Sequence, residues 1–298
     1  MVTRRAKVRI IANPVSGTGG TSAKLVALER LLIRAGCRIS VHPTTCPGDA
    51  SRLAKALGSD ADLVVVAGGD GTVSEVVNGL DTDDGPPIAI MATGGANVLA
   101  RELGLPRDAE GVAAMILAGR TRTIDVGVVD QGRKFLAVLS VGFDASVVKA
   151  VQRTRTGTLG MRGFVLPTIR TAIGYAPPAV TVTVDDGEPV DGALVIVANT
   201  GIYGGIMRVS DRARCDSGRL EVVVFPQGSA SALLRYGWAA IRGRVSHLPG
   251  VICRTGRAIS IASRVDADCQ ADGEYLGSTP VTVHVRPKGA TIVVPPRP

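Results

Sequence analysis

The sequence VVVAGGDGTVSEVVNG, residues 64–79, decides the fold of this 298-residue chain. Three adjacent valines begin an uninterrupted aliphatic run, which is typical of a parallel strand covered on both faces. Beyond the glycines, apolar residues recur at the spacing of one helical face. These residues are Val73, Val76, Val77 and Leu80. The stretch therefore predicts a buried strand, a tight turn and a helix with one inward face.

The turn between strand and helix has the chemistry of a phosphate site. Its glycines let a ligand approach the backbone, and the first turn of a helix offers amide N–H groups and the positive end of the helix dipole. Asp70 adds a carboxylate suited to a metal ion, and Thr72 adds a hydroxyl. A tight turn that binds nothing is the alternative. We favour a ligand site, because open α/β sheets bind ligands where a parallel strand gives way to a helix.

Strands and helices alternate on both sides of this stretch. Apolar runs predict strands at residues 7–12, 38–42 and 88–91, and a helix is expected at about residues 21–35. Such alternation favours an α/β domain with a parallel sheet. No dinucleotide fingerprint, P-loop or nucleophile elbow occurs in it.

From Arg122 onward the chain changes to short β-branched runs separated by turns. The predicted strands cover residues 122–129, 134–141, 180–184, 194–198, 220–225, 258–262 and 282–285. They predict a β-sandwich-like second domain. We expect one domain at residues 1–125 and another, mainly β, at residues 126–298. Helical segments are expected between residues 147 and 175 and at residues 230–243.

The net charge of +8 is concentrated in the C-terminal half. Residues 149–171 carry five cationic side chains and no acid, and residues 222–265 carry six arginines and no acid. A solvated face explains most charge runs, but a surface of one sign also attracts anionic membranes. With only 3 % aromatic residues and no interleaving of basic and aromatic residues, we expect no nucleic-acid partner.

Export and metal-binding signals are weak. Aliphatic runs stay far below the 18 or so residues that span a bilayer. Asn13-Pro14 interrupts the N-terminal apolar run before it resembles a signal peptide. The five cysteines and three histidines lack the spacing of disulfide frameworks or zinc sites. A cytoplasmic protein is therefore expected.

The residues of the central stretch also match a known family. GGDGTVSEVVNG resembles the nucleotide-binding signature of the diacylglycerol kinase catalytic-domain family, which includes soluble bacterial lipid kinases and sphingosine kinases. NPVSG at residues 13–17 and TGGANVLARELGLP at residues 93–106 resemble two further family segments. The GGDG core also occurs in the related NAD kinases, but the second segment favours the lipid kinases. The resemblance implies a Rossmann-like α/β domain of the NAD kinase and diacylglycerol kinase type, followed by a lipid-substrate domain.

The resemblance also implies which residues bind ATP. They are Asn13, Ser16, Gly17, Thr44, Gly68, Gly69, Asp70, Gly71, Thr72, Gly94, Gly95 and Asn97. Asp70 is expected to organise MgATP. Gly95 stands where relatives carry a threonine that contacts the nucleotide, so a backbone contact or Thr93 would have to replace it.

A hairpin turn is predicted at Asp272-Gly273. The family carries a DGE sequence at this place, with acidic residues implicated in taking the proton from the lipid hydroxyl. Asp272 is the first choice for this general base, and Glu274 is the alternative. Because phosphoryl transfer requires positioning and charge neutralisation, we expect these acids to face Asp70 and MgATP across an interdomain cleft.

Two further family segments are matched less closely. A DDG segment that helps to hold a structural Mg²⁺ becomes Asp216-Ser217-Gly218, which leaves Asp216 as its candidate ligand. Gly142-Phe143-Asp144-Ala145 matches a GFDA segment at the expected domain junction, to which we assign no chemistry.

The sequence therefore predicts a lipid kinase that transfers the γ-phosphoryl group of ATP, with Mg²⁺, to a hydroxyl of a diacylglycerol-like lipid. Its expected partners are the lipid substrate and, transiently, an anionic membrane surface. The sequence also allows a homodimer. Two alternatives remain. One is an NAD-kinase-like enzyme, and the other is a catalytically silent lipid- or nucleotide-binding module, which Gly95 and Ser217 keep open.

Overall fold

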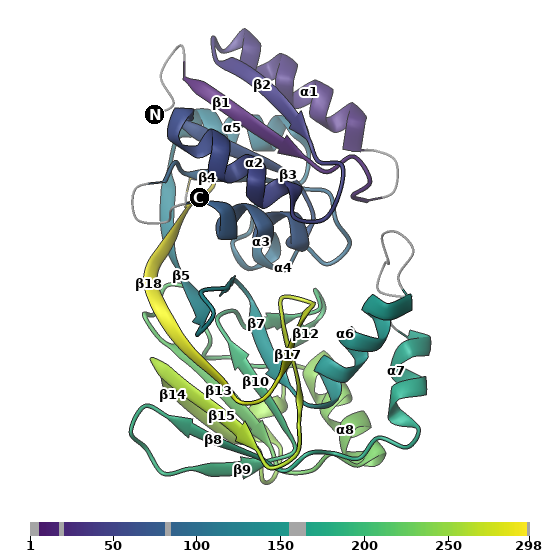
Figure 1. Ribbon diagram of the computed structural model, residues 1–298. Coiled ribbons are helices and arrows are strands. Elements are labelled where there is room, and N and C mark those ends of the chain that lie inside the picture. The colour runs from purple at the N-terminus through teal and green to yellow at the C-terminus, as the bar shows by residue number, and fades with distance from the viewer. Residues whose placement is uncertain (1–5, 18–20, 81–84, 155–164, 297–298) are drawn as a thin grey trace. The chain divides into compact units, whose positions relative to one another are not determined.

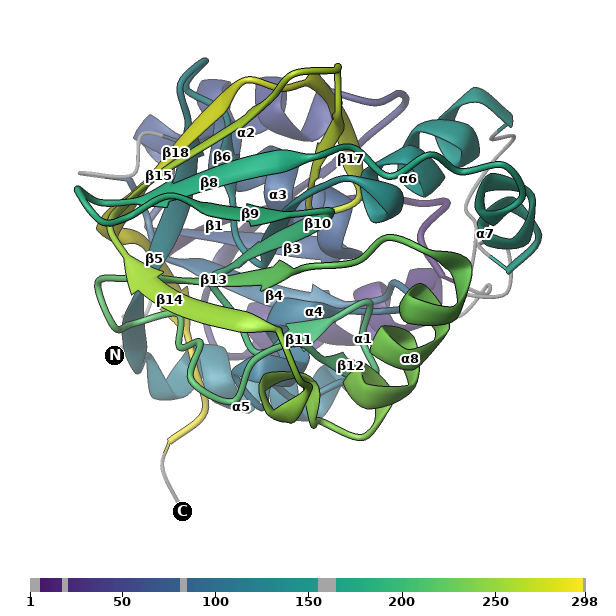
Figure 2. The ribbon, with the colours of Figure 1, turned by 90° about the horizontal axis from the view of Figure 1, so that it is seen from below.

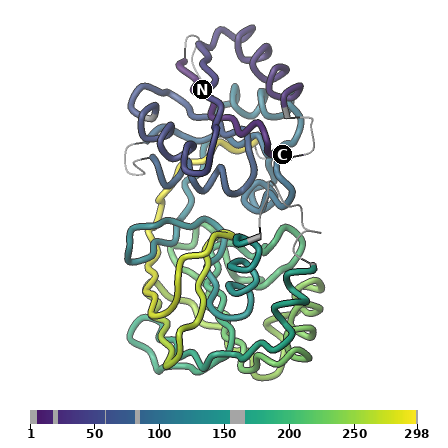
Figure 3. Tube along the Cα trace, turned by 45° about the vertical axis from the view of Figure 1, so that its right-hand side comes forward, coloured from purple at the N-terminus to yellow at the C-terminus, as the bar shows by residue number. Residues whose placement is uncertain are grey.

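The computed structural model describes residues 6–17, 21–80, 85–154 and 165–296. The chain divides into two compact units, which can be followed by colour in Figures 1 and 3. Unit 1 comprises Met1–Ile124 and Lys288–Pro298, and unit 2 comprises Asp125–Pro287. The last strand, β18 (Val281–Val293), belongs to unit 2 in its first half and to unit 1 in its second half. The C-terminal segment is thus part of the unit that begins the chain.

Unit 1 is built on a parallel sheet with the strand order β2-β1-β3-β4. Its strands are β1 (Lys7–Ala12), β2 (Arg38–Pro43), β3 (Leu63–Gly68) and β4 (Ile88–Ala92). Every residue of β3 is buried, which confirms the strand predicted from the valine run. The end of β18 pairs with β4 in parallel, with Ile292 opposite Ile88. The carboxyl ends of the four strands therefore meet at one edge of the sheet.

Helices cover both faces of this sheet. They are α1 (Thr21–Arg34), α2 (Asp49–Leu57), α3 (Asp70–Gly79), α4 (Val98–Glu102) and α5 (Ala109–Ala118), with a short 3-10 turn, η1 (Gly58–Asp60), after α2. Figure 2 shows α2 and α3 on one side of the sheet and α1 and α5 on the other, and each pair is in contact. The predicted apolar stripe of α3, from Val73 to Leu80, is buried.

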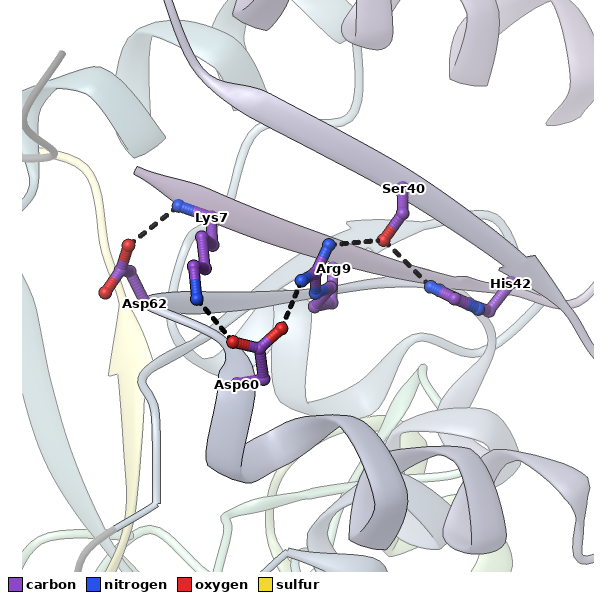
Figure 4. Close-up of polar contacts among 6 residues, drawn as sticks. All are labelled: Lys7, Arg9, Ser40, His42, Asp60 and Asp62. Carbon is purple, nitrogen blue, oxygen red and sulfur yellow. Dashed lines mark hydrogen bonds and ion pairs between the residues drawn. The ribbon is translucent and has the colours of Figure 1, made fainter. Parts of the chain in front are cut away.

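A polar cluster links β1 and β2 to the segment that leads into β3 (Figure 4). Its members are Lys7, Arg9, Ser40, His42, Asp60 and Asp62. Hydrogen bonds from Lys7 and Arg9 lower the pKa of the Asp60 carboxyl. Arg9 also donates to Ser40 Oγ at 2.9 Å. These contacts hold β1 and β2 to the connection that leads into β3.

Unit 2 is a sandwich of two sheets. The first has the order β9-β8-β15-β18, and the second has the order β14-β13-β10-β7-β16-β17. The bounds are β7 (Val138–Val141), β8 (Val180–Val184), β9 (Val190–Gly192), β10 (Leu194–Ala198), β13 (Leu220–Phe225), β14 (Ile252–Gly256), β15 (Ala258–Ser263), β16 (Asp268–Ala271) and β17 (Glu274–Ser278). Val182 and Ile261 of the first sheet share one core with Val197 and Val222 of the second. This arrangement confirms the predicted β-sandwich-like fold.

The remaining elements of the second half extend or surround this sandwich, and β5 joins the first sheet by pairing with β18 and β6. They are β5 (Thr121–Val129), β6 (Lys134–Phe135), β11 (Ile202–Tyr203), β12 (Met207–Arg208), α6 (Phe143–Thr154), α7 (Val165–Ala172), α8 (Ala230–Ile241) and a 3-10 turn, η3 (Val245–His247). Helix α8 covers the outer face of the six-stranded sheet, where Tyr236 packs on Phe225 with ring centroids 4.7 Å apart.

Three predicted elements differ from the structure. The strand expected at residues 134–141 is broken into β6 and β7, because the amides of Leu136 and Ala137 bond to a side chain, described below. The basic helical segment forms two helices, α6 and α7, and residues 155–164 lie outside the described residues. The strand expected at residues 282–285 is part of the much longer β18.

Candidate functional site

Three loops and Thr44 follow the four parallel strands at their carboxyl ends. Backbone hydrogen bonds continue the sheet into them: Asn13 donates to Ala67 O at 2.9 Å, Thr44 to Ala12 O at 2.8 Å and Thr93 to Gly68 O at 3.0 Å. The twelve residues predicted to bind nucleotide, from Asn13 to Asn97, all lie in or next to these loops. Unit 1 thus brings this predicted set together at one edge of its sheet.

Side chains tie the three loops to one another. Asn13 Nδ2 donates to Thr72 Oγ1 at 3.2 Å, which joins the first loop to the GGDG turn. Thr93 Oγ1 donates to Ser16 Oγ at 3.1 Å, which joins the third loop to the first. Three residues that were expected to contact nucleotide, Asn13, Ser16 and Thr72, therefore hold the loops to one another.

Asp70 links the GGDG turn to the GGAN segment. Its Oδ1 accepts the backbone N–H of Val98 at 2.6 Å, at the first residue of α4. Burial raises the pKa of the Asp70 carboxyl, and the hydrogen bonds from the Val98, Asn97 and Leu99 amides offset part of that effect. Asn97 precedes α4 in a left-handed conformation and makes no side-chain cap, so Asp70 supplies the cap from a distant part of the sequence. The sequence does not indicate this role.

The glycines of the two segments fall into two groups. A Cβ built on Gly94 would lie 2.6 Å from Gly69 Cα, so the two loops touch backbone to backbone. Around Gly71 and Gly95, by contrast, a Cβ would find nothing within 4 Å. The open pair gives a ligand access to the backbone next to the N-terminus of α3. This edge therefore fits the phosphate groups of a nucleotide.

Asp272 and Glu274 lie in unit 2, on the hairpin that joins β16 to β17. Asp272 and Gly273 both have positive φ, 48° and 84°, as a two-residue hairpin turn requires. The Asp272 carboxylate accepts three backbone N–H groups, from Leu136 at 2.7 Å, Ala137 at 2.9 Å and Val138 at 3.1 Å. These bonds interrupt the predicted strand at residues 134–141 and fix the carboxylate in position.

Glu274 has a different environment from Asp272. Its carboxylate forms an ion pair with the guanidinium of Arg133, and both side chains are about one third exposed. Arg133 lies in the turn between β5 and β6, and the sequence gives no signal that marks it as Glu274's partner. Glu274 is therefore accessible, whereas Asp272 is held by backbone.

A buried polar network lies behind the Asp272 turn. Gln270, which is fully buried, accepts the N–H of Gly273 through Oε1 at 2.8 Å. Its Nε2 donates to Ser140 Oγ at 2.8 Å and to Asp144 Oδ2 at 3.0 Å. Asp144 belongs to the GFDA segment, for which the sequence predicted no chemical role. Its carboxylate also accepts hydrogen bonds from the hydroxyls of Ser140 and Tyr203. The only sequence signal for this network is a polar residue between Cys269 and Ala271, two positions before Asp272.

Asp216 lies in unit 2 in a loop anchored by Asp125. It pairs with Arg214 at 3.8 Å, while the N–H of Gly218 donates to Asp125 Oδ2 at 2.5 Å. Ser217 bonds locally to the backbone of Arg219. Within the described residues, no three His, Cys, Asp or Glu side chains group as metal ligands. A structural Mg²⁺ at Asp216 would have to draw most of its ligands from carbonyl oxygens and water.

Among the described residues, no helix combines the length and the apolar character needed to cross a bilayer.

Comparisons with known proteins agree with this architecture. Residues 7–129 match the family described as the diacylglycerol kinase catalytic domain, and residues 137–294 match the YegS C-terminal NAD kinase beta sandwich-like domain. A diacylglycerol kinase of Bacillus subtilis is 29 % identical over 92 % of this chain and 91 % of its own length. One from Staphylococcus epidermidis is also 29 % identical, over 93 % of this chain and 88 % of its own.

A crystal structure of a candidate diacylglycerol kinase from Bacillus anthracis superposes with a TM-score of 0.83 at 27 % identity. It covers 99 % of this chain and 97 % of that one. The two matched domains together span nearly all of the sequence, with the catalytic domain first and the sandwich domain second. The chain therefore belongs to the diacylglycerol kinase catalytic-domain family, a family of lipid kinases.

Proposed function

We propose that the chain transfers the γ-phosphoryl group of ATP to a hydroxyl of a diacylglycerol-like lipid. The observation that carries the proposal is the loop edge of unit 1, where the backbone at Gly71 and Gly95 is open beside the N-terminus of α3. Such an edge suits phosphate groups, and in this family the phosphate donor is a nucleotide. The curated relatives named above are diacylglycerol kinases, which supports a lipid acceptor.

On the donor side, unit 1 would bind the triphosphate through the backbone of its loops. Gly71 and Gly95 let phosphate oxygens approach, and the contacts Asn13–Thr72 and Thr93–Ser16 keep the loops in register. Mg²⁺ bound with ATP would neutralise phosphate charge during transfer. We propose that Asp70 positions both the GGAN segment and MgATP.

On the acceptor side, a general base must take the proton of the lipid hydroxyl and must be held in position to do so. We propose Asp272 for this role, since three backbone amides fix its carboxylate. Glu274, paired with Arg133, is the rival. Gln270 acts as a positioning residue, because it holds the N–H of Gly273 in the same turn.

The activity is tested with radiolabelled ATP and purified protein. Diacylglycerol and other lipids with a free hydroxyl are presented in micelles, and NAD is assayed in parallel. Label in a lipid, together with its loss in Asp70→Ala, is the expected result. Label in NAD alone would establish the NAD-kinase-like alternative. No transfer to any acceptor, with ATP binding intact, would favour the silent module.

Matched variants separate the two acids. Asp272→Asn should abolish turnover, whereas Glu274→Gln should retain a measurable rate. Asp272→Asn should also lower the unfolding free energy by about 1–3 kcal/mol, since its amide cannot accept from all three N–H groups. Turnover is therefore measured well below the unfolding temperature of each variant. A dead Glu274→Gln beside an active Asp272→Asn would reverse the assignment.

A further inference from the structure

Helix α8 has two apolar faces, and only one of them is used by the fold. Ala232, Tyr236 and Ala239 are buried against the outer face of the six-stranded sheet. On the opposite side, Leu234 is 77 % exposed, Trp238 58 % and Ile241 55 %. These three residues follow one another at i, i+4 and i+7, so they form a continuous stripe along the helix. Such a stripe in water is unfavourable unless something covers it.

The stripe is bordered by cationic side chains. Arg235 and Arg242 are both exposed, and the guanidinium of Arg242 lies 4.5 Å from the centre of the Trp238 ring. No acidic residue occurs between Val222 and Val265, so the segment around α8 has one sign of charge. An apolar stripe with tryptophan and bordering arginines is the composition of helices that lie in a membrane interface.

Helix α7 repeats the pattern. Leu166 and Ile169 are each 54 % exposed, Ile173, the residue after the helix, is 77 % exposed, and Arg170 is exposed as well. Figures 1 and 2 show α7 and α8 on the same side of unit 2. Two helices on this side of unit 2 therefore each carry exposed apolar and cationic side chains.

We propose that α8, assisted by α7, docks unit 2 onto an anionic phospholipid bilayer. Leu234, Trp238 and Ile241 enter the boundary between headgroups and acyl chains, and Arg235 and Arg242 contact lipid phosphates. The proposal rests on the proposed function in one respect, which is that a lipid substrate requires the protein to reach a membrane. A second copy of the chain fits the α8 surface less well than a bilayer does. A two-fold symmetric contact would bring Arg235 and Arg242 of both copies together, with no acidic residue of the segment to neutralise them.

Vesicle sedimentation tests the surface. Wild-type protein is mixed with phosphatidylcholine vesicles, with or without phosphatidylglycerol, and the bound fraction is measured. The apolar variant carries Leu234→Ser, Trp238→Ser and Ile241→Ser, and the charge variant carries Arg235→Glu and Arg242→Glu. The matched control is Ile33→Ser with Arg34→Glu, two exposed residues of α1 in unit 1.

The wild type and the control should bind anionic vesicles more strongly than neutral ones, and each α8 variant should lose at least about tenfold in affinity. Kinase activity on a short-chain, water-soluble diacylglycerol should be unchanged in both variants, which also shows that they are folded. Equal binding of neutral and anionic vesicles, or full binding by the α8 variants, would overturn the proposal. A stripe that drives self-association, seen as a change in light-scattering mass in the apolar variant, would also overturn it.

The two proposals can fail separately. Vesicle binding without any lipid phosphorylation would contradict the proposed kinase activity but support the docking surface. Phosphorylation of vesicle lipid at the same rate in the wild type and the α8 variants would support the activity but contradict the docking surface.

Discussion

At the scale of single residues, the positions of the GGDG motif differ in what a side chain there would touch. A Cβ on Gly68 would collide with the side chain of Thr72, and a Cβ on Gly69 would press against the backbone of Gly94. Gly71 opens outward, and Asp70 points back to the amide of Val98. The motif therefore joins two loops as well as forming a site. A side chain at Gly68 or Gly69 would therefore disturb the contact between the two loops.

Gly94 and Gly95 offer a matched test of this division. Gly94→Ala places a Cβ 2.6 Å from Gly69 Cα, where only backbone could move, so we expect a loss of about 1–3 kcal/mol in unfolding free energy. Gly95→Ala has free space and should leave stability nearly unchanged. It should weaken ATP binding instead, if phosphate approaches there. Urea unfolding and ATP titration of both variants distinguish these effects, and equal stability loss in the two would contradict the division.

Asp70 predicts a pH effect with a definite sign. Burial raises its pKa in the folded state, so the folded state holds this proton more tightly than the unfolded state does. The favourable contribution is full below the unfolded pKa and is lost as pH rises through the folded pKa. Asp70→Asn keeps an oxygen for the Val98 N–H but removes the charge. It should therefore match or exceed the wild type in stability at neutral pH, while losing kinase activity.

Urea unfolding at pH 4 and pH 7 checks this prediction. The difference between Asp70→Asn and the wild type should be larger at pH 7 than at pH 4. Asp70→Ala, which also removes the cap of α4, should lose about 1 kcal/mol relative to Asp70→Asn at both values. A less stable Asp70→Asn at pH 7 would show that the charge is stabilising.

At the scale of elements, the sequence predicts those helices and strands that depend only on the local pattern of apolar residues. The strand before Gly68 and the stripe on α3 follow from runs and spacing, and both are confirmed. The break at Leu136 and Ala137 could not be predicted, because it depends on a carboxylate more than a hundred residues away. The same holds for the cap that Asp70 gives to α4 and for the pairing of Arg133 with Glu274. Contacts between distant segments decide these features.

Helix packing gives a second matched pair of glycines. Gly79 ends α3 against α2, and a Cβ there would lie 2.1 Å from the carbonyl oxygen of Ser51. Gly79→Ala should therefore separate the two helices and lower the unfolding temperature. Gly237, inside α8, has nothing within 4 Å of a Cβ, so Gly237→Ala should stabilise the chain by up to about 1 kcal/mol. Thermal unfolding of both variants tests the pair, and an unchanged Gly79→Ala would show that the contact is easily relieved.

At the scale of the whole molecule, the chain's last residues belong to the unit with which it begins. Ile292, Val293 and Val294 are buried in unit 1, and Ile292 lies beside Ile88 of β4. The first half of the same strand pairs with β15 in unit 2. One strand thus contributes to two cores. A substitution in its last residues should therefore destabilise β3 and β4, which lie far away in the sequence.

Ile292→Asp tests this consequence. A buried, unpaired carboxylate beside β4 should destabilise unit 1 by several kcal/mol, while the sandwich of unit 2 keeps its own core. Hydrogen exchange followed by mass spectrometry should then show faster exchange in β3 and β4 and unchanged protection in β13. Thr291→Asp, at a half-buried neighbouring position, is the matched control and should have a smaller effect. Faster exchange in β13 to the same extent as in β3 would mean that the two units unfold as one, and that β18 couples their stability instead of serving each core separately.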